Sequence, residues 1–127
     1  MKNVLLTVLI LVALSSITYA HTDPAPVVTI NAVPGKEVAT TVTIHMFAED
    51  SGFYDGIVSI TLREDGKSIA TKSCGEIPQC WFDFSVEHRE KGSHNYAAYA
   101  RDRGGNVKSA SVFVKFIGAT PPPVFVF

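Results

Sequence analysis

The sequence predicts an all-β fold, an antiparallel β-sandwich of about seven strands. Apolar and polar residues alternate along short segments, and the Gly and Pro residues fall between those segments. No window after residue 20 has a helical period. Two acidic turn signatures, at residues 48–52 and 100–106, each lie where an alternating segment must stop and reverse. Two facing sheets with inward apolar side chains satisfy all three observations.

The first 20 residues are predicted to be an export signal. Lys2 supplies a positive start, an apolar run covers residues 4–13, and Thr18 and Ala20 offer the small residues of a cleavage site. The run is too short to span a bilayer. A retained signal anchor is the alternative. Cleavage would leave a mature chain that begins at His21, and we expect that chain to be secreted, periplasmic or at the cell surface.

The mature chain has the length of one domain. We expect a short N-terminal linker at residues 21–26, a sandwich domain at residues 27–117 and a Pro-rich tail at residues 118–127. Pro-rich stretches begin at Pro24 and Pro121, roughly one domain length apart, and each precedes an apolar segment. The tail is therefore either the start of a second repeat or a second linker, and both interpretations stay open.

The charge balance favours neither nucleic acid nor a membrane surface as a partner. The chain has 11 basic and 12 acidic side chains, with a formal net charge of −1 at pH 7. It therefore lacks the basic excess that attracts phosphate backbones and anionic lipids. We expect no nucleic-acid partner and no membrane association after signal cleavage. A protein or a polysaccharide at the cell surface is the expected partner.

Three strands are predicted in the first half of the mature chain. Residues 27–31 form a short apolar strand that ends at the Val33-Pro34-Gly35 turn. Residues 38–48 alternate strictly, which predicts the inward side chains Val42, Ile44, Met46 and Ala48. Residues 57–63 alternate in the same way, which predicts the inward side chains Val58, Ile60 and Leu62.

Four more strands follow. The Asp65-Gly66 pair predicts a tight hairpin turn into a strand at residues 67–71. Residues 80–86, 96–101 and 106–116 are the remaining strands. Their predicted inward side chains are Phe82, Phe84 and Val86, then Tyr96, Ala98 and Ala100, then Val112, Val114 and Phe116.

Cys74 and Cys80 are the only cysteines, and both follow the signal. In an oxidising compartment a structural disulfide is their expected state. A redox role is the alternative, but the spacing lacks the two-residue gap that tunes a thiol pair for exchange. Two cysteines alone do not complete a zinc site.

A set of strand and turn motifs covers most of the mature chain. The motifs are residues 27–30, Pro34-Gly35, residues 42–44, Ala48-x-Asp50, Asp65-Gly66, residues 92–94 and Ala100-x-Asp102 with Gly105-Asn106. This set closely resembles the bacterial Ig-like domain family, from about residue 27 to about residue 116. The resemblance implies an immunoglobulin-like sandwich that serves as a spacer or accessory module of a secreted enzyme or a surface adhesin.

One tyrosine has an expected structural role. Tyr96-x-Ala98 resembles the tyrosine corner of immunoglobulin-like sandwiches. We expect the Tyr96 hydroxyl to bond to the backbone near Lys91 or Gly92, which would fix the loop before the strand. Gly105 and Asn106 are expected to shape the following turn.

The expectation for cofactors is none, with copper and calcium as candidates. Cleavage before His21 would give that residue a free α-amino group beside its imidazole, a chelate for Cu(II) when a second His joins it. His45 faces outward and His88 and His94 flank a turn, so the spacing places no second ligand. A solvated terminal His21 is the alternative.

Calcium is the second metal candidate. Asp50, Asp55, Asp102 and Asn106 are predicted to gather at one end of the sandwich, where two strands finish, and could offer oxygen ligands. The alternative is that Asp50 and Asp102 accept hydrogen bonds from their own turns. Two nearby arginine residues weaken the calcium hypothesis.

Outward-facing aromatic residues are the candidate binding surface. Phe47 and Trp81 are expected on one sheet, and Tyr99 and Phe113 on adjacent strands of the other. Planar rings on a flat sheet can stack on sugar rings or anchor a partner protein. Cross-strand packing on an exposed face is the alternative.

The sequence does not predict an enzyme. It contains no Gly-x-Ser-x-Gly elbow and no His-Glu-x-x-His motif. Glu87, His88 and Glu90 are expected to form a solvated charged loop. The predicted function is therefore a non-enzymatic exported module, a structural spacer or an adhesion and binding domain. The alternatives are a copper-binding protein that uses His21 and a carbohydrate-binding accessory domain that uses the exposed aromatic residues.

Overall fold

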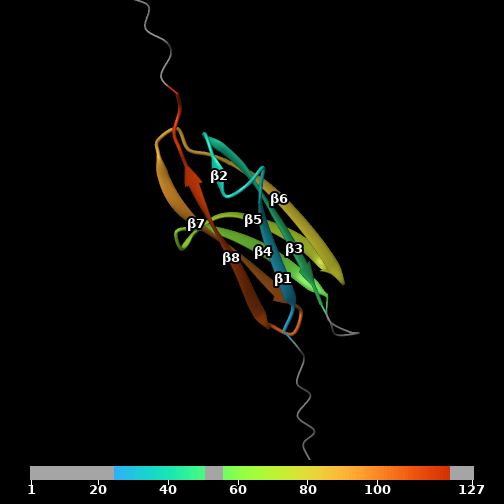
Figure 1. Ribbon diagram of the computed structural model, residues 1–127. Helices are drawn as coiled ribbons and strands as arrows, with labels where there is room; N and C mark the ends of the chain where they lie inside the picture. The colour runs from blue at the N-terminus through green and yellow to red at the C-terminus, as the bar shows by residue number, and fades with distance from the viewer. Residues whose placement is uncertain (1–24, 51–55, 121–127) are drawn as a thin grey trace, which may run out of the picture.

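The computed structural model describes residues 25–50 and 56–120, which fold as two stacked β-sheets (Figure 1). Their eight strands are β1 (Val27–Val33), β2 (Glu37–Val38), β3 (Thr41–Glu49), β4 (Ile57–Glu64), β5 (Lys67–Ile77), β6 (Gln79–Glu87), β7 (Gly92–Asp102) and β8 (Val107–Phe116). One sheet has the order β1-β3-β6, and the other has the order β2-β8-β7-β4-β5. The predicted sandwich is confirmed. The described residues include no helix with the length and hydropathy needed to cross a membrane.

The core lies between the sheets and follows from the alternation in the sequence. Along β3, Val42, Ile44, Met46 and Ala48 are buried, as predicted, while the residues between them are not. The opposite sheet contributes the predicted inward residues of β7 and β8, which are also buried. Burial of a large aliphatic or aromatic side chain stabilises the fold by about 1.5–3 kcal/mol, so these rows hold the sheets together.

The predicted strand at residues 38–48 is two strands rather than one. Its first residue, Val38, belongs to β2, which pairs in parallel with the end of β8. After Ala39 and Thr40 the chain continues as β3, which pairs antiparallel with β1 and β6 in the other sheet. Backbone bonds from Ile117 to Val38 (2.9 Å) and from Lys115 to Lys36 (2.8 Å) explain the change of sheet. Strand β2 thereby pairs with backbone N–H and C=O groups on the edge of β8 that would otherwise be unpaired.

The prediction for the inward face of β4 was wrong at its first residue. Ile57 and Ile60 are fully buried, whereas Val58 is only half-buried. Both neighbours of β4 shift register between Ile57 and Ser59, which marks a bulge. A bulge adds one residue to the strand and reverses the parity of the side chains before it.

The hairpin turn between β4 and β5 has the predicted Asp-Gly chemistry. Asp65 and Gly66 have φ values of 50° and 85°, as a type I′ turn requires at both central positions. Glu64 and Lys67 are paired on either side of the turn. Strand β5 continues to Ile77, beyond the predicted end at residue 71.

The predicted disulfide is confirmed and joins the two sheets. Cys74 lies in β5, an edge strand of the larger sheet, and Cys80 lies in β6, an edge strand of the smaller sheet. Their Cα atoms are 6.0 Å apart. The covalent bond therefore ties the two sheets together at the edge where β5 leads into β6.

Reduction of this disulfide should lower the melting temperature without unfolding the sandwich. The closed loop is short, so we expect a loss of about 2 kcal/mol through unfolded-chain entropy, or roughly 10 °C. A thermal melt with and without reductant measures it. The double variant Cys74→Ala, Cys80→Ala should melt at the reduced temperature and ignore reductant. Complete unfolding on reduction would contradict this view of the core.

A glycine is required where the chain enters β4. A Cβ atom built on Gly56 would lie 2.1 Å from the carbonyl carbon and oxygen of Glu76. Glu76 itself has a φ of 60°, so the β5 backbone bends tightly against Gly56. The Gly56 carbonyl also accepts a bond from the Arg103 amide (3.0 Å). Any side chain here must displace backbone.

Gly56→Ala should therefore destabilise the protein by at least about 2 kcal/mol, because backbone atoms cannot move aside as a side chain can. Gly35→Ala is the matched control, since a Cβ at Gly35 meets nothing within 4 Å. We expect the control to change stability by less than about 0.5 kcal/mol. Urea unfolding of both variants measures the difference, and equal effects would contradict the close approach.

Candidate functional site

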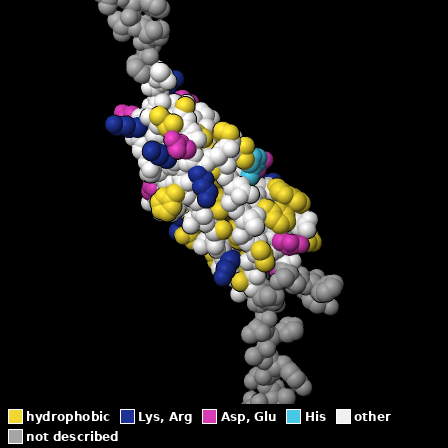
Figure 2. Space-filling view, in the orientation of Figure 1, with side chains coloured by type: hydrophobic (Ala, Val, Ile, Leu, Met, Phe, Trp, Pro, Cys, Tyr) yellow, Lys and Arg dark blue, Asp and Glu magenta, His cyan; other side chains and the backbone are white. Residues whose placement is uncertain are grey.

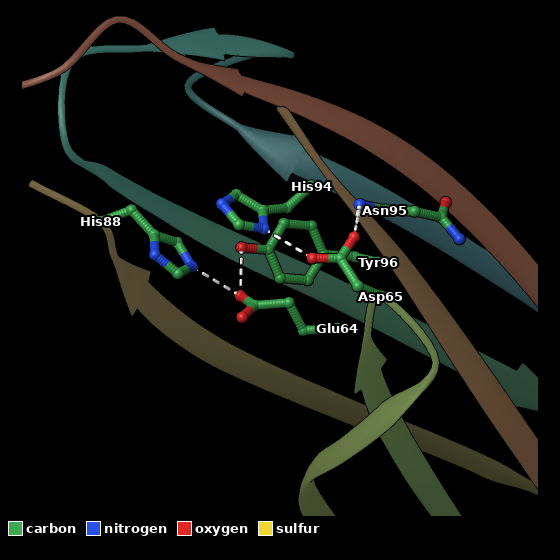
Figure 3. A network of polar contacts seen from close by, with 6 residues as sticks. All are labelled: Glu64, Asp65, His88, His94, Asn95 and Tyr96. Atoms are coloured by element: carbon green, nitrogen blue, oxygen red, sulfur yellow. Dashed lines mark hydrogen bonds and ion pairs between the residues drawn. The ribbon is translucent and has the colours of Figure 1, made fainter. Parts of the chain in front are cut away.

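The candidate site lies where the β4–β5 turn meets the β6–β7 loop (Figure 3). Strand β4 pairs with β7 in a register that sets Glu64 opposite Tyr96. The Asp65 amide then donates to the Asn95 carbonyl (2.8 Å), which continues the pairing into the turn. Two carboxylates from the turn thereby meet two imidazoles, His88 from the loop and His94 from β7. We call Glu64, Asp65, His88, His94 and Tyr96 the polar cluster.

Glu64 is the centre of the polar cluster. Its Oε2 atom accepts one hydrogen bond from the Tyr96 hydroxyl (2.6 Å) and another from His88 Nε2 (2.7 Å). The Glu64 side chain is 18% exposed and that of His88 28% exposed. The carboxylate is thus partly withdrawn from water and held by two donors.

Asp65 holds the second imidazole. Its Oδ2 atom pairs with His94 Nδ1 (2.6 Å), and its Oδ1 atom accepts from the Asn95 amide (2.8 Å). Both oxygens are therefore engaged, one on a ring and one on the backbone. This arrangement fixes the carboxylate and orients the His94 ring.

The two imidazole rings stack on each other. The ring centroids of His88 and His94 are 4.1 Å apart, and the planes differ by 10°. Both rings meet Phe116 edge-on, at 4.9 Å for His88 and 5.7 Å for His94. Phe116 is almost fully buried, so the rings close the end of the hydrophobic core while their nitrogen atoms reach the carboxylates.

The electrostatics of the polar cluster favour charged carboxylates. Burial raises the pKa of Glu64, but hydrogen bonds from His88 and Tyr96 outweigh it and leave that pKa below its ordinary value. The Asn95 amide and then His94 lower the pKa of Asp65. Burial and the bond to Glu64 raise the pKa of Tyr96, which keeps the phenol protonated as a donor.

The expected partner of the Tyr96 hydroxyl was wrong. Tyr96 is fully buried on β7, as predicted, but its hydroxyl donates to the Glu64 carboxylate and not to the backbone near Lys91 or Gly92. The reason is the β4–β7 register, which sets the two residues opposite each other. A carboxylate is also the stronger acceptor.

The expectation of a solvated charged loop was wrong for His88. Its ring is mostly covered and is bonded to Glu64. Glu87 and Arg89 do form an exposed ion pair (3.3 Å). The sequence interpretation missed the cluster because its members lie far apart along the chain and meet only through strand register. The Asp-Gly turn was the one sequence signal that marked its position.

Three of the four residues predicted to bind calcium lie in the part of the chain that the structure describes. Asp102 is buried, and its two carboxylate oxygens accept bonds from the Asn106 amide (2.8 Å) and the Asn106 side chain (3.0 Å). Gly105 has a φ of 85° in the same turn. Asp50 is buried at the end of β3, and its amide donates to the Pro78 carbonyl (2.9 Å). Asp55 lies outside the described residues. The calcium hypothesis stays a prediction.

The aromatic candidates lie on the strands expected of them. Phe47 and Trp81 are paired across β3 and β6 with ring centroids 4.8 Å apart. Tyr99 lies on β7 beneath the Arg63 guanidinium (4.3 Å), and Phe113 is exposed on β8. On the face shown in Figure 2, hydrophobic side chains lie in separate groups among charged ones. A binding role for these rings stays a prediction.

The copper candidate, His21, lies outside the described residues, as do the predicted signal and the end of the Pro-rich tail. The other predicted outward histidine, His45, bonds to Asp83 (2.6 Å) across β3 and β6. It lies in a different sheet from the polar cluster. The copper hypothesis therefore stays a prediction.

Comparisons with known proteins identify the class of fold. Protein-family models and curated protein sequences gave no match. Among solved structures, the chain is similar to the PKD1 domain of Vibrio anguillarum Epp, with a TM-score of 0.57 and 12% identity, over 77% of this chain and 100% of that one. It is also similar to the Clostridium thermocellum CbhA fibronectin(III)-like modules, with a TM-score of 0.54 and 16% identity, over 74% of this chain and 100% of that one.

Both neighbours are immunoglobulin-like β-sandwiches, and this chain has the same fold. The predicted fold class is thereby confirmed at the level of the immunoglobulin-like sandwich. Membership of the bacterial Ig-like domain family stays a prediction, since identities this low establish the fold alone.

Tyr96→Phe should destabilise the protein by about 1.5–3 kcal/mol, the range for a hydrogen bond to a charged group. The ring remains in the core, so only the bond to Glu64 is lost. Tyr99→Phe is the control, because Tyr99 keeps its contact with Arg63 through its ring. We expect the control to stay within about 0.5 kcal/mol of the unsubstituted protein. Equal losses in urea unfolding would contradict the role of the hydroxyl.

Proposed function

We propose that this chain is an exported, non-catalytic immunoglobulin-like module that acts as a structural spacer or adhesion domain of a secreted or cell-surface protein. The observation that carries the proposal is the path of the chain. The described chain enters at the start of β1 and leaves after β8 at the opposite end of the sandwich (Figure 1). A domain with this path extends a larger protein by the length of its own long axis.

The sequence on either side of the sandwich supports the spacer role. Pro24 and Pro26 precede β1, and Pro121, Pro122 and Pro123 follow β8. Pro-rich linkers are extended and semi-rigid, so they keep neighbouring domains apart. A rigid domain between two such linkers is suited to hold other parts at a distance.

The disulfide supports an extracytoplasmic location. Cys74 and Cys80 are bonded and no free cysteine remains in the described chain. Disulfides persist in secreted and periplasmic proteins and are rare in the cytosol. Together with the predicted signal at residues 1–20, this bond favours an exported protein.

The spacer role is tested by joining two copies of residues 21–127 head to tail and measuring small-angle X-ray scattering. Because each sandwich is entered and left at opposite ends, the pair should have a maximum dimension about twice that of one copy. The single copy is the control. A pair that folds back into a compact particle would contradict the proposal.

Tryptophan fluorescence distinguishes adhesion through the aromatic residues from a pure spacer role. Trp81 is the only tryptophan in the sequence and is 58% exposed, so its emission reports on the Phe47–Trp81 surface directly. A pure spacer leaves the emission unchanged when polysaccharides are added. Quenching that is lost in Phe47→Ala, while Phe113→Ala retains it, would instead assign the carbohydrate-binding alternative.

A further inference from the structure

We propose that Glu64, His88 and His94 form a binding site for a first-row transition metal ion, with Zn²⁺ as the ion tested below. One donor atom from each of the three side chains lies within 4.8 Å of the others. They come from three separate parts of the chain, the end of β4, the β6–β7 loop and the start of β7. This site is independent of the spacer role and of His21.

The chemistry of the donor set selects the class of ion. Two imidazole nitrogens and one carboxylate oxygen suit Zn²⁺ and its first-row neighbours, whereas Ca²⁺ and Mg²⁺ prefer oxygen ligands alone. Three protein ligands leave a fourth position for water or for a group from another molecule. The three side chains are between 18% and 28% exposed, so solvent ions can reach them.

The contacts behind the three ligands are those that support metal sites. Asp65 accepts the Nδ1 proton of His94 (2.6 Å), so the neutral ring keeps its lone pair on Nε2. Asp65 is itself fixed by the Asn95 amide. Tyr96 donates to Glu64 (2.6 Å) and orients that carboxylate. A carboxylate behind a ligating histidine raises its basicity and fixes its orientation. Asp65 and Tyr96 are thus positioning residues.

Metal binding requires one ring to turn. A metal ion lies in the plane of each imidazole that binds it, and the planes of His88 and His94 are stacked 10° from parallel. The two rings therefore do not point at one ion as they lie in Figure 3. His88 is the ring expected to turn, because it lies in the loop after β6 and its Nε2 contact is with Glu64, itself a ligand, whereas Asp65 holds His94. The ion takes the place of the proton on His88 Nε2, and Nδ1 of the neutral ring takes up a proton from solvent in exchange, while Glu64 remains a ligand.

A pocket lies beside the cluster, although none of the three proposed ligands lines it. It has a volume of about 550 Å³ and its lining includes Gly92, Ser93 and Phe116. Phe116 contacts both imidazole rings. A Cβ atom at Gly92 would lie 3.8 Å from His94 Nε2. The nitrogen left without the Asp65 contact therefore faces the side of Gly92, at the edge of the pocket.

Isothermal titration with Zn²⁺ tests the proposal. The protein is residues 21–127 with His21→Ala, which removes the chelate predicted at the mature N-terminus. We expect one bound ion, and affinity at least about tenfold weaker in His88→Gln and His94→Gln. His45→Gln is the matched control, because His45 has the same kind of carboxylate contact, with Asp83 at 2.6 Å, but lies apart from the cluster. The control should bind as well as the parent.

A second measurement needs no variant in the cluster and stands even where a substituted protein fails to fold. The ring NMR signals of His88 and His94 should shift together on addition of one equivalent of Zn²⁺, while those of His45 stay in place. Co²⁺ should give the strong visible absorption of a tetrahedral site. Absence of Zn²⁺ binding, or binding that survives His88→Gln and His94→Gln, would overturn the proposal.

Discussion

The hydrogen bond from Tyr96 to Glu64 is the constraint on which this end of the molecule depends. Tyr96 is fully buried, and a buried hydroxyl without an acceptor costs about 1–3 kcal/mol. Glu64 supplies that acceptor because β4 and β7 pair in one register. A carboxylate drawn to the core in this way attracts further donors, and His88 fills that role. The part of the polar cluster around Glu64 thus follows from one buried tyrosine, while Asp65 and His94 are joined by their own contact.

At the opposite edge of the sandwich, a disulfide bond and a close backbone contact constrain the strands. The disulfide between Cys74 and Cys80 joins β5 to β6, and Gly56 lets the β4 backbone approach Glu76. Between the two edges the inward rows of β3, β7 and β8 are aliphatic or aromatic and bury one another. A sandwich this small has a modest core, so local constraints at its edges add to its stability.

The sequence predicted the strands and their inward side chains better than the contacts between strands. Period-2 alternation located the inward residues of β3, β6, β7 and β8, because alternation is a local property. It placed Val58 inward in error, since a bulge depends on both neighbouring strands. Strand register was likewise beyond the sequence interpretation, so Glu64 was not connected with Tyr96 or His88. The Asp-Gly turn was predicted, yet the second role of Asp65, as the partner of His94, required the fold.

The contacts within the polar cluster also bear on how strongly it would hold a metal ion. An ion must displace the His88 to Glu64 hydrogen bond and the stacking of His88 on His94, and those losses subtract from its affinity. The same contacts hold the ligands close together, so less entropy is lost when the ion binds. The segment after β8 lies beside this site, because the Ala119 amide bonds to the carbonyl of Arg89, one residue from His88 (2.9 Å). A turn of the His88 ring would therefore occur next to the point where the chain leaves the sandwich.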